Sequence, residues 1–298
     1  MQYVILDLEW NSGYSSKTEG FINEIIEFGA VKLDENMQLI GQFSIFVRPE
    51  ITRRLKTKVK ELTQITNEDL KHGSTFTYAV SKFRKFAEDC VIMSWSTSDL
   101  KALEENCRYY YQSERIPFLR YYADVQAYCQ QAIDSADKNQ MALQTAAEKL
   151  SVDMSDIPLH RAVGDSILTA RVLKKVYDRR CFEPYIQLVD DEFYKKLNFH
   201  NTFIYHLENP LIDREKMYFL CPECGAVCTC TEEWTVKGKA FRTIAVCESC
   251  NVRYKGKIQF KLCYEGVKIL KRLVPLQSEE TLSEDAQEQI NRNEPEES

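Results

Sequence analysis

The sequence predicts an α/β protein, in which a mixed β-sheet flanked by helices is followed by a small module built around cysteines. Three observations lead to this prediction. The chain opens with strand-like runs, continues with alternating helical and strand-like segments, and later carries two Cys-x-x-Cys motifs. With 298 residues, 44% of them hydrophobic and 28% charged, the chain is long enough for one sizeable core and a smaller unit.

The first three segments are expected to be strands of one sheet. Residues 2–9 are a mostly apolar run, and residues 24–32, EIIEFGAVK, are a second one. Asp34-Glu-Asn36 predicts a hairpin turn into a third strand at 37–48, which Pro49 ends.

Helical and strand-like segments alternate after this hairpin. A short helix is expected at 58–65, and a longer one at 76–90, where Phe76, Val80 and Phe83 recur at helical spacing. A strand at 91–95 leads into a helix at 99–111, and 118–125 is expected to be the last strand. Further helices are expected at 124–134, 140–150 and 161–180. A hairpin followed by such an alternation predicts a mixed sheet covered by helices.

The chain divides into four parts. Residues 1–180 hold the alternating elements, 181–215 are expected to be a connector or helical extension, 216–275 the cysteine module, and 276–298 an acidic disordered tail. From Lys216 to Arg272 there are eleven Lys or Arg against five Asp or Glu, whereas Gln277 to Ser298 hold eight acids and one base. Lack of aromatic residues also predicts disorder in the tail, with a helix that docks on a partner as the alternative.

No membrane association or secretory route is expected. The first strand begins almost at residue 1, which leaves no room for a signal peptide, and no apolar stretch approaches the roughly 20 residues of a membrane helix. Without a secretory signal, eleven cysteines favour reduced thiols and a metal site over disulfides. The expected compartment is the cytoplasm, and the formal net charge of −6 argues against a protein that coats duplex nucleic acid.

Asp7 and Glu9 end the first apolar run, in a pattern that suits a divalent cation. Residues two apart on a strand point the same way, so both carboxylates share one face while Leu6 and Leu8 point into the core. Neighbouring carboxylates repel each other unless a cation lies between them, and Mg²⁺ and Mn²⁺ prefer oxygen ligands.

Asp99, His160 and Asp165 have ordinary roles when each is taken alone. Asp99 is then an acid in the first turn of a helix, Asp165 a surface acid, and His160 a loop residue. In this order and context, they favour two metal ions about 4 Å apart that hold a scissile phosphate. An imidazole beside the attacking water is then the natural general base.

Residues 1–180 resemble the DEDDh 3′–5′ exonucleases, the DnaQ-like or RNase T superfamily, which has an RNase H-like fold. The matching motifs are Leu6-Asp-Leu-Glu9, Trp95-Ser-Thr-Ser-Asp-Leu-Lys-Ala-Leu103 and His160-x-Ala-x-x-Asp165. The second motif is similar to that of the enhanced-RNA-interference and histone-mRNA exonucleases, which makes RNA the favoured substrate. The resemblance implies that Asp7, Glu9, Asp99 and Asp165 bind two Mg²⁺ or Mn²⁺ ions. It also implies that His160 deprotonates the water that releases 5′-mononucleotides from a single-stranded 3′ end.

The chain departs from many of these relatives after the motif glutamate, where it has Trp10-Asn11. This position commonly meets the terminal nucleotide in the family. Trp10 is therefore expected either to stack on the last base or to cap the end of the sheet, and Asn11 is a second candidate contact. The basic run from Arg53 to Lys60 either attracts phosphates or forms a solvated helix face, and the second interpretation is preferred. Glu24 and Glu27 are expected to serve strand structure.

Cys221-Pro-Glu-Cys224 and Cys247-Glu-Ser-Cys250 are two knuckles separated by 22 residues. Four thiolates at this spacing predict one structural Zn²⁺ in a closed tetrahedral site of the ribbon type, while Cys228 and Cys230 stay free. The zinc replaces a core that so small a module cannot build. The basic residues of the module favour a surface that grips nucleic acid, with docking of a protein partner as the alternative. The aromatic residues expected to stack on bases there are Trp234, Phe241, Tyr254 and Phe260.

The sequence thus predicts a metal-dependent 3′–5′ exonuclease that acts on single-stranded RNA. A DNA-directed exonuclease would use the same chemistry, because the two substrates differ in contacts to the 2′-hydroxyl, which the sequence does not locate. A third alternative is a non-catalytic, nucleic-acid-binding regulatory protein that retains the domain. The presence of all five residues in order argues against it.

Overall fold

A computed structural model describes residues 1–134 and 140–276, so the acidic segment 277–298 lies outside the described residues. The chain forms two compact units, one from Met1 to Asn198 and one from Phe199 onward. Among the described helices, none combines the length and the apolar character needed to cross a membrane.

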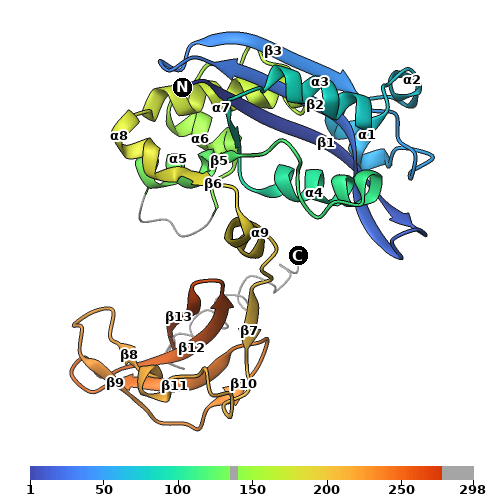
Figure 1. Cartoon of the computed structure of the whole chain (residues 1–298). Coiled ribbons are helices and arrows are strands. Elements are labelled where there is room, and N and C mark those ends of the chain that lie inside the picture. The colour runs from blue at the N-terminus through green and yellow to red at the C-terminus, as the bar shows by residue number, and fades with distance from the viewer. Residues whose placement is uncertain (135–139, 277–298) are drawn as a thin grey trace, which may run out of the picture. The chain divides into compact units, whose positions relative to one another are not determined.

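The first unit is built on a six-stranded sheet in the order β3-β2-β1-β4-β5-β6 (Figure 1). Strands β1 (Tyr3–Ser15), β2 (Gly20–Leu33) and β3 (Leu39–Phe46) pair antiparallel. Strands β4 (Val91–Ser94) and β5 (Tyr121–Asp124) are added in parallel, and β6 (Ile186–Leu188) pairs antiparallel with β5. The mixed sheet predicted from the sequence is confirmed.

Helices cover both faces of this sheet. On one face, α3 (Phe76–Phe86), α4 (Ser98–Tyr111) and α9 (Asp191–Leu197) share a core with Leu6 and Leu8. On the other, α5 (Val125–Ile133), α6 (Leu143–Lys149), α7 (Ala162–Val176) and α8 (Arg179–Phe182) pack with Tyr3 and Ile5. The short helices α1 (Thr57–Thr63) and α2 (Asn67–Lys71) pack on Ile26, and the 3-10 turn η1 spans Glu183–Tyr185.

Strand β1 is longer than predicted, and its pairing explains where Asp7 and Glu9 lie. Its parallel pairing with β4 ends at Ile5, opposite Met93, while its antiparallel pairing with β2 continues to Ser15. The two acids therefore lie in the middle of β1, just beyond the end of β4, and a bulge follows Glu9. Because side chains alternate along a strand, Asp7 and Glu9 continue the face of Tyr3 and Ile5.

The segment 181–215, expected to be a connector or helical extension, is divided between the two units, and α8, η1 and α9 make much of its first part helical. Strand β6 extends the first sheet, and Phe193 and Leu197 of α9 are buried in its core. The first unit thus runs to Asn198 rather than to residue 180. Strand β7 (Thr202–Ile204) pairs with a strand of the second unit, which therefore begins before residue 216. The short, half-exposed strands of this segment lack the apolar pattern that identifies an element in sequence.

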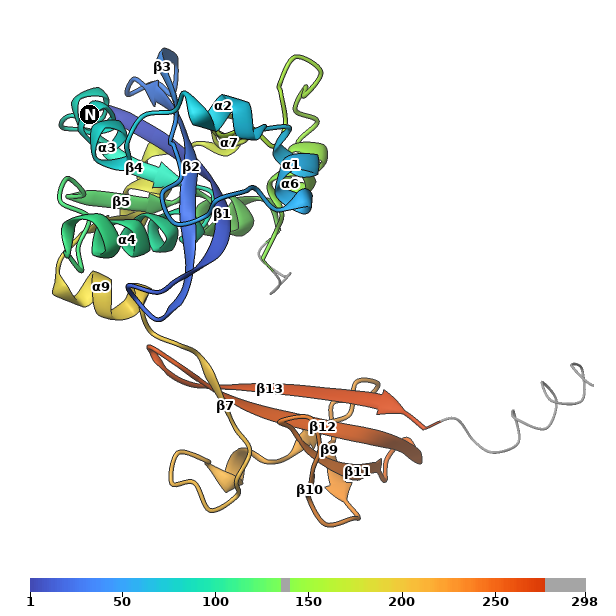
Figure 2. The same cartoon turned by 90° about the vertical axis from the view of Figure 1, so that its right-hand side faces the viewer.

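The second unit consists mainly of β-strands (Figure 2). Its sheet has the order β13-β12-β11-β9-β8, with β10 on β11 and β7 on β12. Strands β11 (Phe241–Cys247), β12 (Val252–Cys263) and β13 (Gly266–Pro275) form its long part. The short elements are η2 (Arg214–Lys216), β8 (Phe219–Leu220), β9 (Val227–Cys230) and β10 (Thr235–Val236). One face is buried around Phe241, Tyr254, Ile258 and Phe260.

Candidate active site

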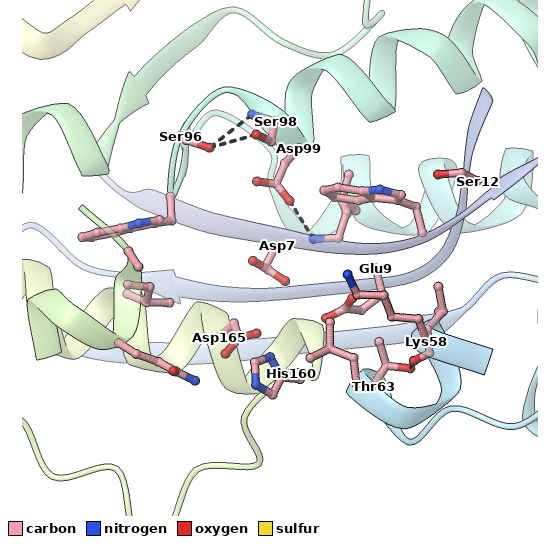
Figure 3. A pocket seen from close by; sticks show the side chains of 18 of the residues that line it. Asp7, Glu9, Ser12, Lys58, Thr63, Ser96, Ser98, Asp99, His160 and Asp165 are labelled. Carbon is pink, nitrogen blue, oxygen red and sulfur yellow. Dashed lines mark hydrogen bonds between the residues drawn. The ribbon is translucent and has the colours of Figure 1, made fainter. Parts of the chain in front are cut away.

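A pocket of about 770 Å³ in the first unit collects the four predicted metal ligands and the predicted general base: Asp7, Glu9, Asp99, Asp165 and His160 (Figure 3). Strand β1 supplies two of them, and the first turns of α4 and α7 supply Asp99 and Asp165. Carboxylate oxygens of Asp7, Glu9 and Asp165 lie within 4.8 Å of one another. The fold thus brings acids that are far apart in the sequence into one cluster.

Asp99 lies beside this cluster and is held against β1. Its Oδ1 accepts a hydrogen bond of 2.9 Å from the backbone N–H of Leu8, and the residue is buried. Its negative charge contributes to the raised pKa of Asp7. The bond to Leu8 restricts the direction of the Asp99 carboxylate, which lines the same pocket.

The electrostatics of the cluster suit a divalent cation. Burial raises the pKa of Asp7 well above its ordinary value, and repulsion from Asp99 and Asp165 raises it further. Burial and neighbouring acids raise the pKa of Glu9 to about 8, and burial raises that of Asp99 to about 7. Burial also raises the pKa of Asp165. A cation among these oxygens would favour their ionised forms, and a set of hard oxygen donors fits Mg²⁺ or Mn²⁺.

The loop before α7 brings His160 to the pocket beside Asp165 (Figure 3). His160 has a backbone φ of 59°, an uncommon conformation for a residue with a side chain. The loop packs tightly on the first turn of α7, because a Cβ at Gly164 would lie 2.0 Å from the carbonyl oxygen of Pro158. Only glycine permits this approach. The glycine of the His160–Asp165 motif thus helps to shape the loop that carries the histidine.

A buried ion pair, not predicted from the sequence, ties the start of α7 to the sheet. The carboxylate of Glu27 on β2 is fully buried and accepts hydrogen bonds from Arg161 Nε (3.1 Å) and Nη2 (2.8 Å). It also accepts a longer bond of 3.4 Å from the backbone N–H of Ala162. Arg161 directly follows His160, so the pair fastens the segment between His160 and Asp165. The spacing of glutamates in EIIEFG gives no sign of this partner.

Of the two residues that follow Glu9, only Trp10 lines the pocket. Trp10 also packs against the core of the first unit, so its position agrees with both sequence interpretations. Asn11, expected as a second substrate contact, is 1% exposed. Its Nδ2 donates to the carbonyl of Arg54 (3.2 Å) and its Oδ1 accepts from the N–H of Lys56 (3.1 Å). The expectation for Asn11 is therefore wrong in this structure, because both ends of its amide hold the neighbouring loop.

The loop held by Asn11 and the start of α1, which follows it, supply two lysines to the pocket. Lys56 and Lys58 of the basic run line the pocket, although a solvated helix face was the preferred interpretation. Buried Glu24 secures the same loop, because it accepts hydrogen bonds of 2.7 Å from the backbone N–H groups of Ile51 and Thr52. Leu143 and Gln144 of α6 also line the pocket, and no sequence motif could have identified them.

In the second unit, the four predicted cysteines gather as one cluster. Ligand sulfurs of Cys221, Cys224, Cys247 and Cys250 all lie within 4.8 Å of one another. The distance from Cys221 Sγ to Cys250 Sγ is 4.0 Å, and that from Cys224 Sγ to Cys247 Sγ is 3.6 Å. A tetrahedral zinc site with Zn–S bonds of about 2.3 Å requires sulfurs about 3.8 Å apart. The donor set thus fits one zinc ion.

The aromatic residues expected to stack on bases in this unit do not form an open platform. Phe241, Tyr254 and Phe260 have no exposed surface. Trp234 is half-buried and stacks on Phe219, with ring centroids 5.9 Å apart. The stacking prediction is wrong for Phe241, Tyr254 and Phe260, because alternation in β11 and β12 turns these rings inward.

Comparison with known proteins identifies the first unit. The RNase_T family profile, described as "Exonuclease", matches residues 4–173. The probable 3′-5′ exonuclease KapD of Bacillus subtilis is 29% identical over 120 residues, which are 39% of this chain and 55% of KapD. A PolC-type DNA polymerase III of Thermotoga maritima is 26% identical over 171 residues, 57% of this chain and 11% of the polymerase. The chain thus spans about half the length of KapD and a small part of the polymerase.

Solved structures show the same fold. The nuclease domain of 3′hExo, a DEDDh family member bound to rAMP, aligns with a TM-score of 0.52 at 22% identity, over 63% of this chain and 96% of that chain. Cell-death related nuclease 4 (CRN-4) aligns with a TM-score of 0.50 at 18% identity, over 63% of this chain and 65% of that chain. These similarities confirm the predicted RNase H-like fold. Because the family profile covers more than half of the sequence, the chain belongs to the RNase_T exonuclease family.

Proposed function

We propose that this chain is a metal-dependent 3′–5′ exonuclease that removes 5′-mononucleotides from single-stranded RNA. One observation carries the proposal: Asp7, Glu9 and Asp165 converge in a pocket that also holds Asp99 and His160. A cluster of half-buried acids that repel one another is unfavourable by itself, and a pair of divalent cations is what these oxygens suit. The four carboxylates would hold the two ions, and the four cysteines would hold one structural zinc.

Bound Mg²⁺ or Mn²⁺ ions supply Lewis-acid polarisation of the phosphodiester and a more acidic water. His160, at the pocket beside Asp165, would take the proton of the attacking water as the water oxygen bonds to phosphorus. The bond between phosphorus and the 3′ oxygen of the preceding nucleotide would break, that oxygen would take up a proton from solvent, and a 5′-mononucleotide would be released. Lys56 and Lys58 attract the phosphates entering the pocket, and Trp10 contacts the terminal base.

RNA is the favoured substrate because 3′hExo, which shares the fold, has been solved with rAMP, and a related structure concerns recognition of a histone mRNA stem-loop. DNA is the second candidate because the DNA polymerase of Thermotoga maritima shares 26% identity over 57% of this chain. Initial rates on RNA and DNA oligomers of the same sequence, labelled at the 5′ end, distinguish the two. Faster degradation of the DNA oligomer would make this a DNA exonuclease.

The activity itself is tested by two substitutions in the full-length chain. Asp7→Asn should abolish Mn²⁺-dependent shortening of an oligonucleotide with a 3′-hydroxyl, while the fold is retained. His160→Ala should lower kcat by roughly 10²–10⁴-fold, because it removes the general base, and should leave Mn²⁺ binding by calorimetry intact. A phosphate at the 3′ end serves as the substrate control. Full activity of either variant would contradict the proposed roles.

A further inference from the structure

The outer face of the sheet in the second unit is rich in positively charged side chains. Strands β11, β12 and β13 contain no Asp or Glu. Their buried side chains alternate with side chains on the opposite face, and all but one of their basic residues belong to that opposite face. These residues are Arg242, Arg253, Lys255, Lys257, Lys261, Lys268 and Arg272, and together they are called the basic face below.

The strand register brings these cations directly opposite one another. Lys257 of β12 pairs with Arg242 of β11 on one side and with Arg272 of β13 on the other. Lys261 of β12 likewise pairs with Lys268 of β13. Like charges opposite each other across a sheet destabilise the pairing, so the bare face is electrostatically unfavourable. Within residues 140–276, no ion pair is made by any member of the basic face to offset this cost.

The basic face offers charge but little means of reading bases. The large aromatic rings of β11 and β12 lie on the buried side of the sheet. Phe203 of β7, opposite Lys261, is half-buried, and the Lys261 ammonium lies 6.0 Å from its ring centroid. A surface of this kind suits phosphate contacts, which position a strand without recognising its sequence.

From this geometry we infer that the basic face binds the phosphate backbone of a single-stranded nucleic acid. The inference rests on the proposed function for the class of ligand, and it assigns the charge of the second unit to capture of the substrate strand. Alternate residues along β12 are about 6.6–6.8 Å apart, so its cations form a row on which a strand with regularly spaced phosphates can lie. Binding is therefore independent of base sequence and weakens steeply with salt.

The test measures binding and catalysis separately in the full-length, zinc-loaded chain. One variant combines Arg242→Gln, Lys257→Gln and Arg272→Gln. The matched control combines Lys174→Gln, Lys175→Gln and Arg180→Gln. These three exposed cations lie in the last turn of α7 and in α8, away from Asp165 in the first turn of α7. Both variants change the formal net charge from −6 to −9. Binding of a fluorescent single-stranded 30-mer is followed by anisotropy from 50 to 300 mM salt, without added divalent metal.

The face variant should bind up to about a hundredfold more weakly at 0.1 M salt. The reason is that losing three phosphate contacts makes the slope of log K against log salt shallower by about 2. The control should bind like the unmodified chain. Zinc content and Tm identify any loss of folding. Equal affinity and slope in the face variant and the unmodified chain, or an equal loss in the control, would overturn the inference.

A small chromogenic diester, the p-nitrophenyl ester of thymidine 5′-monophosphate, reports on the pocket alone when it is assayed with Mn²⁺. Both variants should hydrolyse it as the unmodified chain does, because the substituted residues lie outside the pocket. If no form of the chain hydrolyses this ester or an oligonucleotide, while the face variant still loses binding, the proposed exonuclease activity fails and the binding surface stands.

Discussion

The buried ion pair between Glu27 and Arg161 gives the sharpest test of how the fold positions the site. Glu27 has no exposed side-chain surface, whereas the Arg161 side chain is 32% exposed. The substitution Arg161→Met removes the cation and leaves the carboxylate buried. Its remaining partners would be the Ala162 N–H and the Ser44 hydroxyl, both at 3.4 Å.

Substitutions of the two partners should not lower the free energy of unfolding by the same amount. Breaking a buried pair by removing one member costs about 3–5 kcal/mol, and we expect Arg161→Met to lie in that range because Glu27 cannot reach water. Glu27→Gln keeps the shape of the side chain and leaves a half-exposed arginine that water can solvate, so about 1–2 kcal/mol is expected. In the double variant, the loss of unfolding free energy should be smaller than the sum of the two single losses by more than about 0.5 kcal/mol, since the residues are in contact.

Stability is measured by urea unfolding in a Trp234→Phe background, so that Trp10 and Trp95 report on the first unit. The arginine variant should also lose about 10- to 100-fold in kcat, because a displacement near 1 Å in the His160 segment is enough to misplace the general base. Arg171→Met is the control, since it breaks an exposed pair between Arg171 of α7 and Asp156 in the turn before this helix, and it should keep full activity. Additive free energies of unfolding, or unchanged kcat in Arg161→Met, would refute this reasoning.

Three further outcomes are expected. The folded-state pKa of Glu9, about 8, lies above its ordinary 4.5, so this group's contribution to stability is full below pH 4.5 and is lost as pH rises through about 8. The metal-free Tm of the first unit should therefore fall between pH 6 and 8.5 and recover with millimolar Mn²⁺; a flat profile would contradict the clustering of these acids. Trp10→Ala should raise KM for single-stranded substrates about tenfold while Trp10→Phe restores it, given about 1–3 kcal/mol per stacked base; an unchanged KM would exclude stacking. Cys247→Ser should lose the stoichiometric zinc and the cooperative unfolding of the second unit, whereas Cys228→Ser keeps both; equal zinc content in the two would disprove the four-cysteine site.

The spacing of residues along the chain was sufficient to predict the elements and motifs that depend on sequence neighbours. The helix expected at 99–111 is observed at Ser98–Tyr111, and the short strand at 91–95 is observed at Val91–Ser94. The cluster of four cysteines could also be predicted from local spacing, because two close pairs of thiolates can bind one ion in few arrangements. The long extension of β1 to Ser15 was missed because its backbone pairing with β2 continues after the apolar pattern stops.

By itself, the sequence determined which chemistry this protein holds: the carboxylates, the imidazole and the thiolates are named by short motifs. The tertiary structure alone decided what surrounds them. Asn11 turns inward to hold a loop, Glu27 finds Arg161 across the fold, and the rings of Phe241 and Tyr254 are buried while the cations gather outside. The physical reason is that a strand has two faces, and only its register and long-range packing decide which of them meets water.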